Sequence, residues 1–270
     1  MRKDMAIPKV IHYCWFGGNE LPEKAVKCVE SWRKYCPDWK IKEWNEKNYD
    51  VQKIPYIRDA YKEKKWAFVS DYARLDVVWQ HGGIYLDTDV ELIKPLDSLL
   101  EQEGFFALER QSLCINTGLG FGAVPENRVL GQLMELYENL SFYTEDGRLN
   151  LIACPRYSTD FFLKRGYQIK DATQYCEEII IYGSEYFCPM DFNTGQMTIT
   201  ENTYGIHWYE ASWFPESDKK IHDVEMRIRE RYPERLAKMM CLLYRNMYRL
   251  IEYFQKGILS EKMKEKWMKS

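Results

Sequence analysis

The sequence predicts an α/β protein in which helices flank a sheet, with a helical C-terminal end. Residues 9–16, KVIHYCWF, form a strand-like run, and residues 22–35 follow with apolar side chains at helical spacing. Residues 39–44, WKIKEW, then alternate apolar and charged side chains, as a strand does. A strand, a helix and a second strand in this order are typical of a parallel sheet. From residue 224 onward most of the chain is helical in pattern.

The residues between these two regions predict the remaining elements. Residues 45–65 are polar, and we expect them to be irregular ahead of a helix. In chain order we then expect a helix over 66–81, strands at 84–86, 90–92, 105–108 and 119–123, a helix over 128–139, a loop, a helix over 159–165, and short strands at 179–182, 185–188 and 203–208.

Length and composition limit the classes of protein that the chain can belong to. The 270 residues suffice for one large domain with an appendage, and we expect a domain over 1–215 and a basic helical extension over 216–270. An apolar fraction of 46% excludes general disorder. A net charge of −3 argues against a nucleic-acid partner, although residues 219–270 carry fourteen Lys or Arg against seven Asp or Glu.

The eight cysteines form no C-x-x-C pair, which excludes a zinc framework of clustered cysteines. The N-terminus, MRKDMAIPKV, lacks the apolar core of a secretory signal, and no run reaches the length of a membrane span. We therefore expect free thiols and a cytoplasmic protein.

Residues 66–91, WAFVSDYARLDVVWQHGGIYLDTDVE, hold the strongest candidate site. Apolar side chains at helical spacing predict one face turned to a core, with Asp71 and Arg74 three residues apart on another face. Two glycines end the helix, and a short apolar strand leads to Asp87 and Asp89. In an extended chain these two carboxylates point the same way and repel each other unless a cation lies between them. Mg²⁺ or Mn²⁺ prefers such oxygen ligands, whereas an isolated D-x-D is more often a polar turn.

The candidate residues combine into a site for a nucleotide diphosphate. Ligands of parallel sheets bind beyond the carboxyl ends of the strands, where Trp15 and Asp87 both lie. An aromatic side chain can stack on a base, and a metal can neutralise a diphosphate that leaves as its bond to carbon breaks. Glycosyl transfer from a sugar nucleotide is the reaction that this set of residues serves.

Four blocks of sequence resemble family 32 of the glycosyltransferases, which carry the sugar-binding DXD motif. The family includes bacterial capsular and lipopolysaccharide sugar transferases and fungal α-1,6-mannosyltransferases. The resemblance implies a GT-A fold, a divalent metal, a UDP-sugar or similar donor, and retention of anomeric configuration. The blocks are IPKVIHYCWFGG at 7–18, KKWAFVSDYARLDVVWQHGGIYLDTDVE at 64–91, EYFCP at 185–189 and ITENTYGIHWYEASW at 199–213.

The resemblance also implies a role for each matching residue. A common family form has a second His after His207 and a Gly before the Ser-Trp pair, where this chain has Trp208 and Ala211. The implied donor contacts are Trp15, which would stack on the base, and Phe16; Ser70, Asp71 and Arg74 at the ribose, sugar and phosphates; Asp87 at the ribose, sugar or metal; and Ser212 and Trp213 closing over the diphosphate. The implied metal ligands are Asp89, Asp87 and His207, with His207 also able to contact phosphate, and the implied catalytic residues are Asp87, Asp89 and Arg74.

The mechanism of retention has two alternatives. A double displacement needs a nucleophile beneath the anomeric carbon, for which Glu109, Asn116, Asp160 and Glu210 are conceivable. The resemblance favours front-face substitution instead, in which the leaving phosphate helps to deprotonate the acceptor. Two other functions remain open: a phosphatase of the haloacid dehalogenase type, which also uses D-x-D but needs a GD dipeptide that is absent here, and a non-catalytic nucleotide-sugar-binding protein.

The C-terminal helical pattern has an apolar stripe from Leu236 to Phe254, with Arg235, Arg245 and Arg249 beside it. Such a helix can lie on an anionic membrane surface or pack against another helix. A glycan or lipid-linked oligosaccharide acceptor at the inner face of the cell membrane, in synthesis of a capsule or lipopolysaccharide type, suits the first alternative.

Overall fold

The computed structural model describes residues 6–192, 194–209 and 216–255, and it confirms a mixed α/β architecture. Two short 3₁₀ turns, at Asp97–Leu99 and Ser184–Tyr186, lie between the main elements. The strands are β1 Val10–Cys14, β2 Lys40–Trp44, β3 Gly83–Tyr85, β4 Val90–Leu92, β5 Gly104–Ala107, β6 Phe121–Ala123, β7 Gln174–Cys176, β8 Ile179–Tyr182 and β9 Gly205–His207; the helices are α1 Glu23–Tyr35, α2 Pro55–Lys62, α3 Trp66–His81, α4 Arg128–Glu138, α5 Cys154–Leu163, α6 Glu216–Arg231 and α7 Glu234–Gln255.

Seven strands form one sheet in the order β2-β1-β3-β6-β5-β8-β7. β1 pairs in parallel with β2 and β3, and β5 pairs in parallel with β8. β6 runs antiparallel to both β3 and β5, so β1, β3, β5 and β8 all point the same way. Their carboxyl ends therefore lie along one edge of the sheet, where ligands of such sheets bind. The mixed, helix-flanked sheet predicted for a GT-A fold is confirmed.

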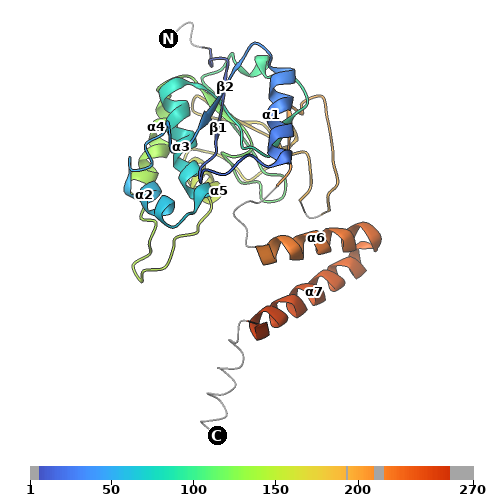
Figure 1. Ribbon diagram of the computed structural model, residues 1–270. Coiled ribbons are helices and arrows are strands. Elements are labelled where there is room, and N and C mark those ends of the chain that lie inside the picture. Colours follow the sequence, from blue (N-terminus) through green and yellow to red (C-terminus); the bar gives the residue numbers. More distant parts are fainter. Residues whose placement is uncertain (1–5, 193, 210–215, 256–270) are drawn as a thin grey trace. The chain divides into compact units, whose positions relative to one another are not determined.

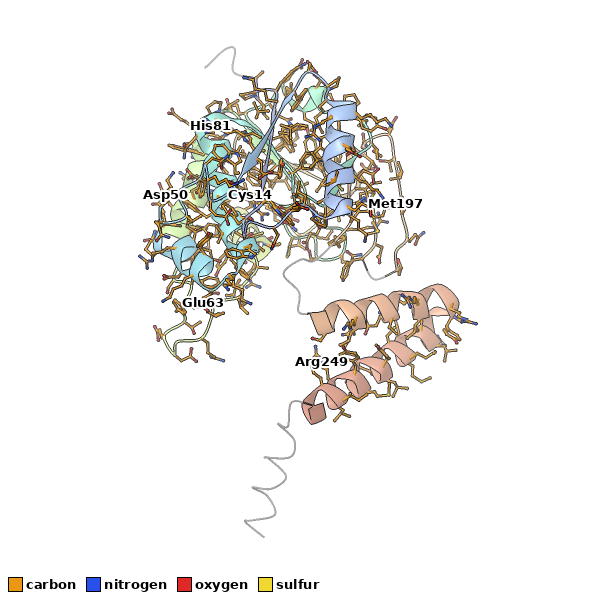
Figure 2. The ribbon with its side chains drawn as sticks, viewed as in Figure 1. Cys14, Asp50, Glu63, His81, Met197 and Arg249 are labelled. Atoms are coloured by element: carbon orange, nitrogen blue, oxygen red, sulfur yellow. The ribbon has the colours of Figure 1, made fainter. Side chains whose placement is uncertain are left out.

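Helices cover both faces of the sheet, with α1 on one face and α2 to α5 on the other (Figure 1). The side chains between α3 and the sheet form the larger apolar core, and Cys14 at the end of β1 lies within it (Figure 2). α3 is buried on nearly every side, since each residue from Phe68 to Val78 is buried. The predicted division of this helix into a core face and a separate Asp71/Arg74 face is therefore wrong, because the helix lies between the sheet and its neighbours α2 and α4.

A second sheet of two strands pairs β4 with β9 in antiparallel register. Val90 lies opposite His207, although more than a hundred residues separate them in the chain. The indole of Trp32 in α1 donates a hydrogen bond of 2.7 Å to the Val90 carbonyl oxygen and so holds β4 against α1. This small sheet brings the residues after β3 next to the end of β9.

Several predicted elements differ from the observed ones. α2 occupies part of the 45–65 stretch, where Pro55 at its first turn supplies a favourable helix start. α5 begins at Cys154, five residues before the predicted start. The predicted strand at 185–188 is wrong, because the 3₁₀ turn Ser184–Tyr186 occupies its place. β7 was not predicted, since its three residues give too short a pattern.

The C-terminal part of the chain forms a second compact unit, which we describe by itself. Its single predicted helical stretch is two helices, α6 and α7, separated by Tyr232 and Pro233. Proline lacks the amide hydrogen that a continuing helix needs. In the described part of the chain no helix is long and apolar enough to cross a membrane. All eight cysteines of the protein are free thiols, as predicted.

Candidate active site

Asp87, Asp89 and His207 form a cluster in which one ligand atom from each lies within 4.8 Å of the others. Asp87 follows β3 at the carboxyl edge of the large sheet, and Asp89 lies directly before β4. His207 ends β9, and its Nε2 lies 3.2 Å from Oδ1 of Asp89. The pairing of β4 with β9 therefore adds an imidazole to the two carboxylates of the D-x-D motif. The structure brings together the three residues that the sequence predicts as metal ligands.

The surroundings of His207 fit a bound cation. Its Nδ1 is buried and has no hydrogen-bond partner among the described residues. A buried polar atom without a partner is uncommon and is expected where an ion or water binds. Burial disfavours the charged imidazole, but the carboxylates of Asp89 and Asp87 outweigh burial and raise the pKa of His207 above its usual value. The cluster thus attracts positive charge, whether a proton or a metal ion.

The chemistry of the three ligands fits a divalent ion that accepts both oxygen and nitrogen. Carboxylate oxygens suit Mg²⁺ and Mn²⁺, and a neutral imidazole can also coordinate first-row transition metals. The side chain of Asp87 keeps 31% of its surface exposed, so the cluster is open on that side. A substrate phosphate could therefore approach an ion held there.

Arg74 lies buried behind the cluster and contacts two carboxylates. Its Nη2 is 3.1 Å from Oδ1 of Asp71, and its Nη1 is 3.5 Å from Oδ2 of Asp87. Its Nε donates a hydrogen bond of 3.0 Å to the Ser70 carbonyl oxygen, which fixes the guanidinium within α3. Burial raises the pKa of Asp71 to about 6, although Arg74 opposes this rise. Arg74 therefore orients the first aspartate of the D-x-D motif from below.

Two further residues position Asp87, and sequence reasoning did not single them out. The Tyr85 hydroxyl donates a hydrogen bond of 2.8 Å to Oδ1 of Asp87. Gly118 accepts a hydrogen bond of 3.0 Å from the Asp87 amide through its carbonyl oxygen. A Cβ atom at Gly118 would lie 2.1 Å from Oδ2 of Asp87, so a side chain there would displace the carboxylate. Gly118 lies in the 116–118 loop between two predicted strands. A glycine at that place was the sequence feature that could have indicated a close approach of the backbone to the site.

The predicted donor contacts have different environments. Trp15 is partly buried, and its Nε1 donates a hydrogen bond of 2.7 Å to the Asn19 carbonyl oxygen. Phe16 is 4% exposed and packs edge-on against Tyr49 in the core, so the structure does not present its ring to a ligand. The Ser70 hydroxyl donates back to the Trp66 carbonyl oxygen within α3. The predicted contacts Ser212 and Trp213 lie outside the described residues.

The conceivable nucleophiles also differ in their surroundings. Asp160 forms an exposed ion pair of 2.7 Å with Arg156 along α5. Glu109 accepts hydrogen bonds from Asn116 Nδ2 at 2.7 Å and from the Ser112 hydroxyl at 2.5 Å, and its charge contributes to the raised pKa of His207. Glu109 thus acts electrostatically on His207, a member of the cluster. Glu210 lies outside the described residues.

Comparison with known proteins agrees with this geometry. Residues 22–106 match the family model described as the glycosyltransferase sugar-binding region containing the DXD motif. Inositol phosphoceramide mannosyltransferase 3 of Schizosaccharomyces pombe is 31% identical over 120 residues, which cover 43% of this chain and 33% of that protein. Inositol phosphoceramide mannosyltransferase 1 of the same organism is 27% identical over 171 residues, which cover 58% of this chain and 52% of that protein.

A human relative, α-1,4-N-acetylglucosaminyltransferase, is 37% identical over 78 residues, covering 28% of this chain and 21% of that protein. The chain thus spans a third to a half of the two fungal relatives. The match to the solved PaToxG glycosyltransferase covers 59% of this chain and 69% of that chain, at 19% identity and a TM-score of 0.47. Arg74, Asp87 and Asp89 all lie within residues 22–106, the segment that matches the model of the glycosyltransferase sugar-binding region containing the DXD motif.

Proposed function

We propose that the protein is a metal-dependent glycosyltransferase that moves a hexose from a nucleotide-diphosphate sugar, with UDP-sugars as the first candidates, to a glycan or lipid-linked acceptor. The observation that carries the proposal is the cluster of Asp87, Asp89 and His207 at the carboxyl edge of the sheet. Two of its members lie in the segment that matches the DXD region. The names of the fungal and human relatives, all sugar transferases, support the same class of reaction.

The residues of the cluster have separate tasks in this proposal. Mn²⁺ or Mg²⁺, held by the two aspartates and His207, would neutralise the diphosphate as its bond to the sugar breaks. Tyr85 and Arg74 hold the Asp87 carboxylate in place, so the ligand does not need to reorganise when the donor binds. Stacking of the base on Trp15, and closure by Ser212 and Trp213, complete the proposed donor site.

We propose front-face substitution for the retaining step. The leaving phosphate takes the proton of the acceptor hydroxyl as the new glycosidic bond forms on the same face of the sugar. Glu109 is the rival nucleophile, but hydrogen bonds from Ser112 and Asn116 already engage both of its carboxylate oxygens. A covalent glycosyl-Glu109 adduct in the mass spectrum of enzyme quenched with donor would contradict front-face substitution.

A panel of donors tests the proposed function against its rivals. The protein is incubated with UDP-, GDP- and other nucleotide sugars and Mn²⁺, with and without EDTA. We expect release of the nucleoside diphosphate from one donor, and we expect EDTA to abolish it, because the diphosphate leaves poorly without the cation. Release of phosphate from simple monoesters would indicate the phosphatase, and tight donor binding without turnover would indicate a binding protein.

We further propose that the C-terminal helices attach the enzyme to an anionic membrane surface, where a lipid-linked acceptor would be found. Ala237 and Cys241 of α7 are buried, as is Ile221 of α6. Arg245 forms an ion pair of 2.6 Å with Glu225 of α6. The sequence predicted Arg245 as one of the basic residues available to a membrane, but in the structure its charge is paired inside the C-terminal unit. The apolar side chains of α7 that stay exposed are Leu236, Met239, Leu242, Leu243, Met247, Leu250 and Ile251.

This exposed apolar stripe has basic neighbours on the same helix. Arg235, Lys238 and Arg249 are exposed along α7. An interfacial helix combines these two features, since its apolar face enters the boundary between headgroups and acyl chains while cations attract anionic lipid. The inositol phosphoceramide in the names of the fungal relatives is itself a membrane lipid, which supports an acceptor at the membrane.

Flotation with lipid vesicles tests the membrane proposal. We expect the protein to float with vesicles that contain phosphatidylserine. It should float less with pure phosphatidylcholine, because that lipid offers no net negative charge to the basic side chains of α7. Leu243→Glu should reduce the floating fraction strongly, since it places a charge in the apolar stripe. Asn246→Glu adds the same charge at an exposed polar position of α7 and should reduce it less. Equal effects of the two variants would contradict insertion of the stripe.

A further inference from the structure

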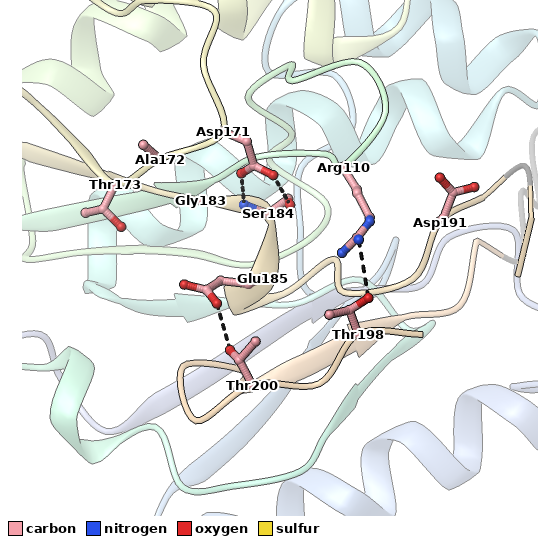
Figure 3. Close-up of a pocket in the computed structure, with 10 residues that line it drawn as sticks. All are labelled: Arg110, Asp171, Ala172, Thr173, Gly183, Ser184, Glu185, Asp191, Thr198 and Thr200. Atoms are coloured by element: carbon pink, nitrogen blue, oxygen red, sulfur yellow. Dashed lines mark hydrogen bonds between the residues drawn. The ribbon is translucent and has the colours of Figure 1, made fainter. Parts of the chain in front are cut away.

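A polar cavity lies at the carboxyl edge of the large sheet, and its lining includes no residue of the metal cluster. Its volume of about 420 Å³ is in the range of small-molecule sites. Arg110 follows β5 and residues 183–185 follow β8, so the cavity lies at the same edge of the sheet as Asp87. Figure 3 shows the side chains that line it. The lining residues are Arg110, Asp171, Ala172, Thr173, Gly183, Ser184, Glu185, Asp191, Thr198 and Thr200.

Hydrogen bonds among its lining residues hold the cavity open. Asp171 accepts from the Ser184 amide at 2.7 Å and from the Ser184 hydroxyl at 2.6 Å. Glu185 accepts from the Thr200 hydroxyl at 2.8 Å and from Asn202 Nδ2 at 2.9 Å. A carboxylate has about four lone-pair sites, so each of these two can accept further hydrogen bonds from a ligand.

Arg110 supplies the donors of the cavity. Its Nη1 donates to the Pro189 carbonyl oxygen at 3.2 Å, and its Nη2 donates to the Thr198 hydroxyl at 3.3 Å (Figure 3). A guanidinium has five N–H groups that can donate hydrogen bonds. The Thr198 hydroxyl can donate a hydrogen bond to a ligand while it accepts one from Arg110. The Thr173 side chain adds another hydroxyl to the lining. The cavity thus offers donors and acceptors together, as a polyhydroxylated ligand requires.

The charges of the lining select against an anion. The lining contains one guanidinium, from Arg110, and the carboxylates of Asp171, Glu185 and Asp191, so acidic side chains outnumber basic ones there. A phosphate or carboxylate ligand would meet like charge in partly desolvated surroundings. The donor diphosphate therefore does not belong here, and an uncharged ligand rich in hydroxyl groups does.

One aromatic side chain, Tyr209, connects the metal cluster to the segment that lines one side of the cavity. The Tyr209 ring packs against His207 at 4.4 Å between centroids, and its hydroxyl lies 2.8 Å from Sγ of Cys188. The Tyr209 ring also packs against Phe192 at 4.9 Å between centroids, and Phe192 directly follows Asp191, which lines the cavity. Tyr209 thus contacts both the proposed metal ligand His207 and Phe192, the sequence neighbour of a lining residue of the cavity.

We propose that this cavity binds an uncharged sugar unit of the acceptor glycan, next to the unit that receives the transferred hexose. The inference rests on the proposed transferase function, which supplies the need for an acceptor at this edge. It predicts that acceptors with a neutral sugar at this subsite are used and that acceptors with a uronic acid or phosphate there are rejected.

Filling the cavity tests the proposal. Ala172→Phe places a ring in the cavity, whereas Lys170→Phe adds the same ring at an exposed position two residues earlier, outside the lining. The probes are the methyl glycosides of glucose, galactose, mannose and N-acetylglucosamine, with methyl glucuronide and inositol phosphate as anionic counterparts. Binding is measured by saturation-transfer NMR, and metal-dependent donor hydrolysis without acceptor is measured on the same samples.

We expect at least one neutral glycoside to bind, and we expect Ala172→Phe to weaken it at least about tenfold while Lys170→Phe leaves it unchanged. Thr198→Val removes one hydroxyl from a side chain of the same shape and should weaken binding by roughly three- to tenfold. This variant takes the place of Ala172→Phe as the test if Ala172→Phe does not fold. Donor hydrolysis should stay within about twofold of wild type in all folded variants, because no lining residue contacts the metal cluster directly.

Binding of no neutral glycoside, undiminished binding in Ala172→Phe, or stronger binding of an anionic probe would each overturn the proposal. Absence of metal-dependent donor hydrolysis in the wild-type protein would instead refute the transferase function. The binding measurements do not depend on turnover, so the two failures can be told apart.

Discussion

Replacing Asp89 with alanine is expected to lower metal-dependent turnover of the nucleotide-sugar donor by roughly a thousandfold, equivalent to about 4 kcal/mol of transition-state stabilisation. Asp89 contributes a carboxylate to the cluster and contacts Nε2 of His207 at 3.2 Å. Without it, a divalent ion keeps Asp87 and His207 as its protein ligands. The measurement is the initial rate of nucleotide release at saturating Mn²⁺.

The same variant should retain its fold, because removal of one of two neighbouring carboxylates relieves repulsion in the metal-free protein. Wild-type protein should gain thermal stability when Mn²⁺ is added, and Asp89→Ala should gain much less. Glu91→Gln is the matched control: it removes a charge two residues away but keeps an oxygen that can accept the hydrogen bond from Trp208 Nε1. Wild-type turnover in Asp89→Ala, or equal losses in both variants, would refute the assignment of the metal site.

Replacing Arg74 with leucine is expected to lower the free energy of unfolding by about 3–5 kcal/mol, because it leaves buried carboxylates without their cation. The Arg74 side chain is 5% exposed, and its partner Asp71 is 8% exposed. Leucine fills part of the volume of the arginine side chain. The loss of unfolding free energy should therefore come more from the unpaired carboxylates than from an empty cavity. Urea denaturation followed by circular dichroism measures the change.

Arg156→Leu is the matched control, since Arg156 also pairs with an aspartate, Asp160, one turn along a helix. Its side chain is 73% exposed, so its loss should cost less than about 1 kcal/mol. Similar losses of unfolding free energy in the two variants would contradict the expectation that the buried ion pairs of Arg74 stabilise the fold more than an exposed one.

The deficit of Arg74→Leu should also depend on pH. Burial already raises the pKa of Asp71 to about 6 in the wild-type fold, and loss of Arg74 raises it further. Asp71 then binds its proton more tightly in the folded variant than in the unfolded chain, so the folded variant loses stability as pH rises above the usual aspartate pKa. The deficit relative to wild type should therefore be larger at pH 7 than at pH 4. A deficit that grows as pH falls would contradict the role of Asp71.

Local sequence predicted the part of the candidate site that is close in the chain. The apolar strand before Asp87 and the one-residue spacing to Asp89 indicate two neighbouring carboxylates at a strand end, and the structure has them there. His207 was predicted through resemblance, because one histidine gives no pattern of its own. Gly118 and Tyr85 were missed as positioning residues, since their contacts with Asp87 arise between segments that lack a shared periodicity.

Sequence by itself determined the α/β class, the order of most elements and the chemistry of the metal ligands, because periodicity and residue type act over a few neighbouring positions. Tertiary structure decided which distant residues meet. The pairing of β4 with β9 places His207 beside the aspartates, and the burial of α3 turns Asp71 and Arg74 from an ordinary helical pair into a buried one. The cavity beyond the carboxyl ends of β5 and β8 depends on the tertiary structure in the same way, since strand pairing over long separations depends on how the whole core packs.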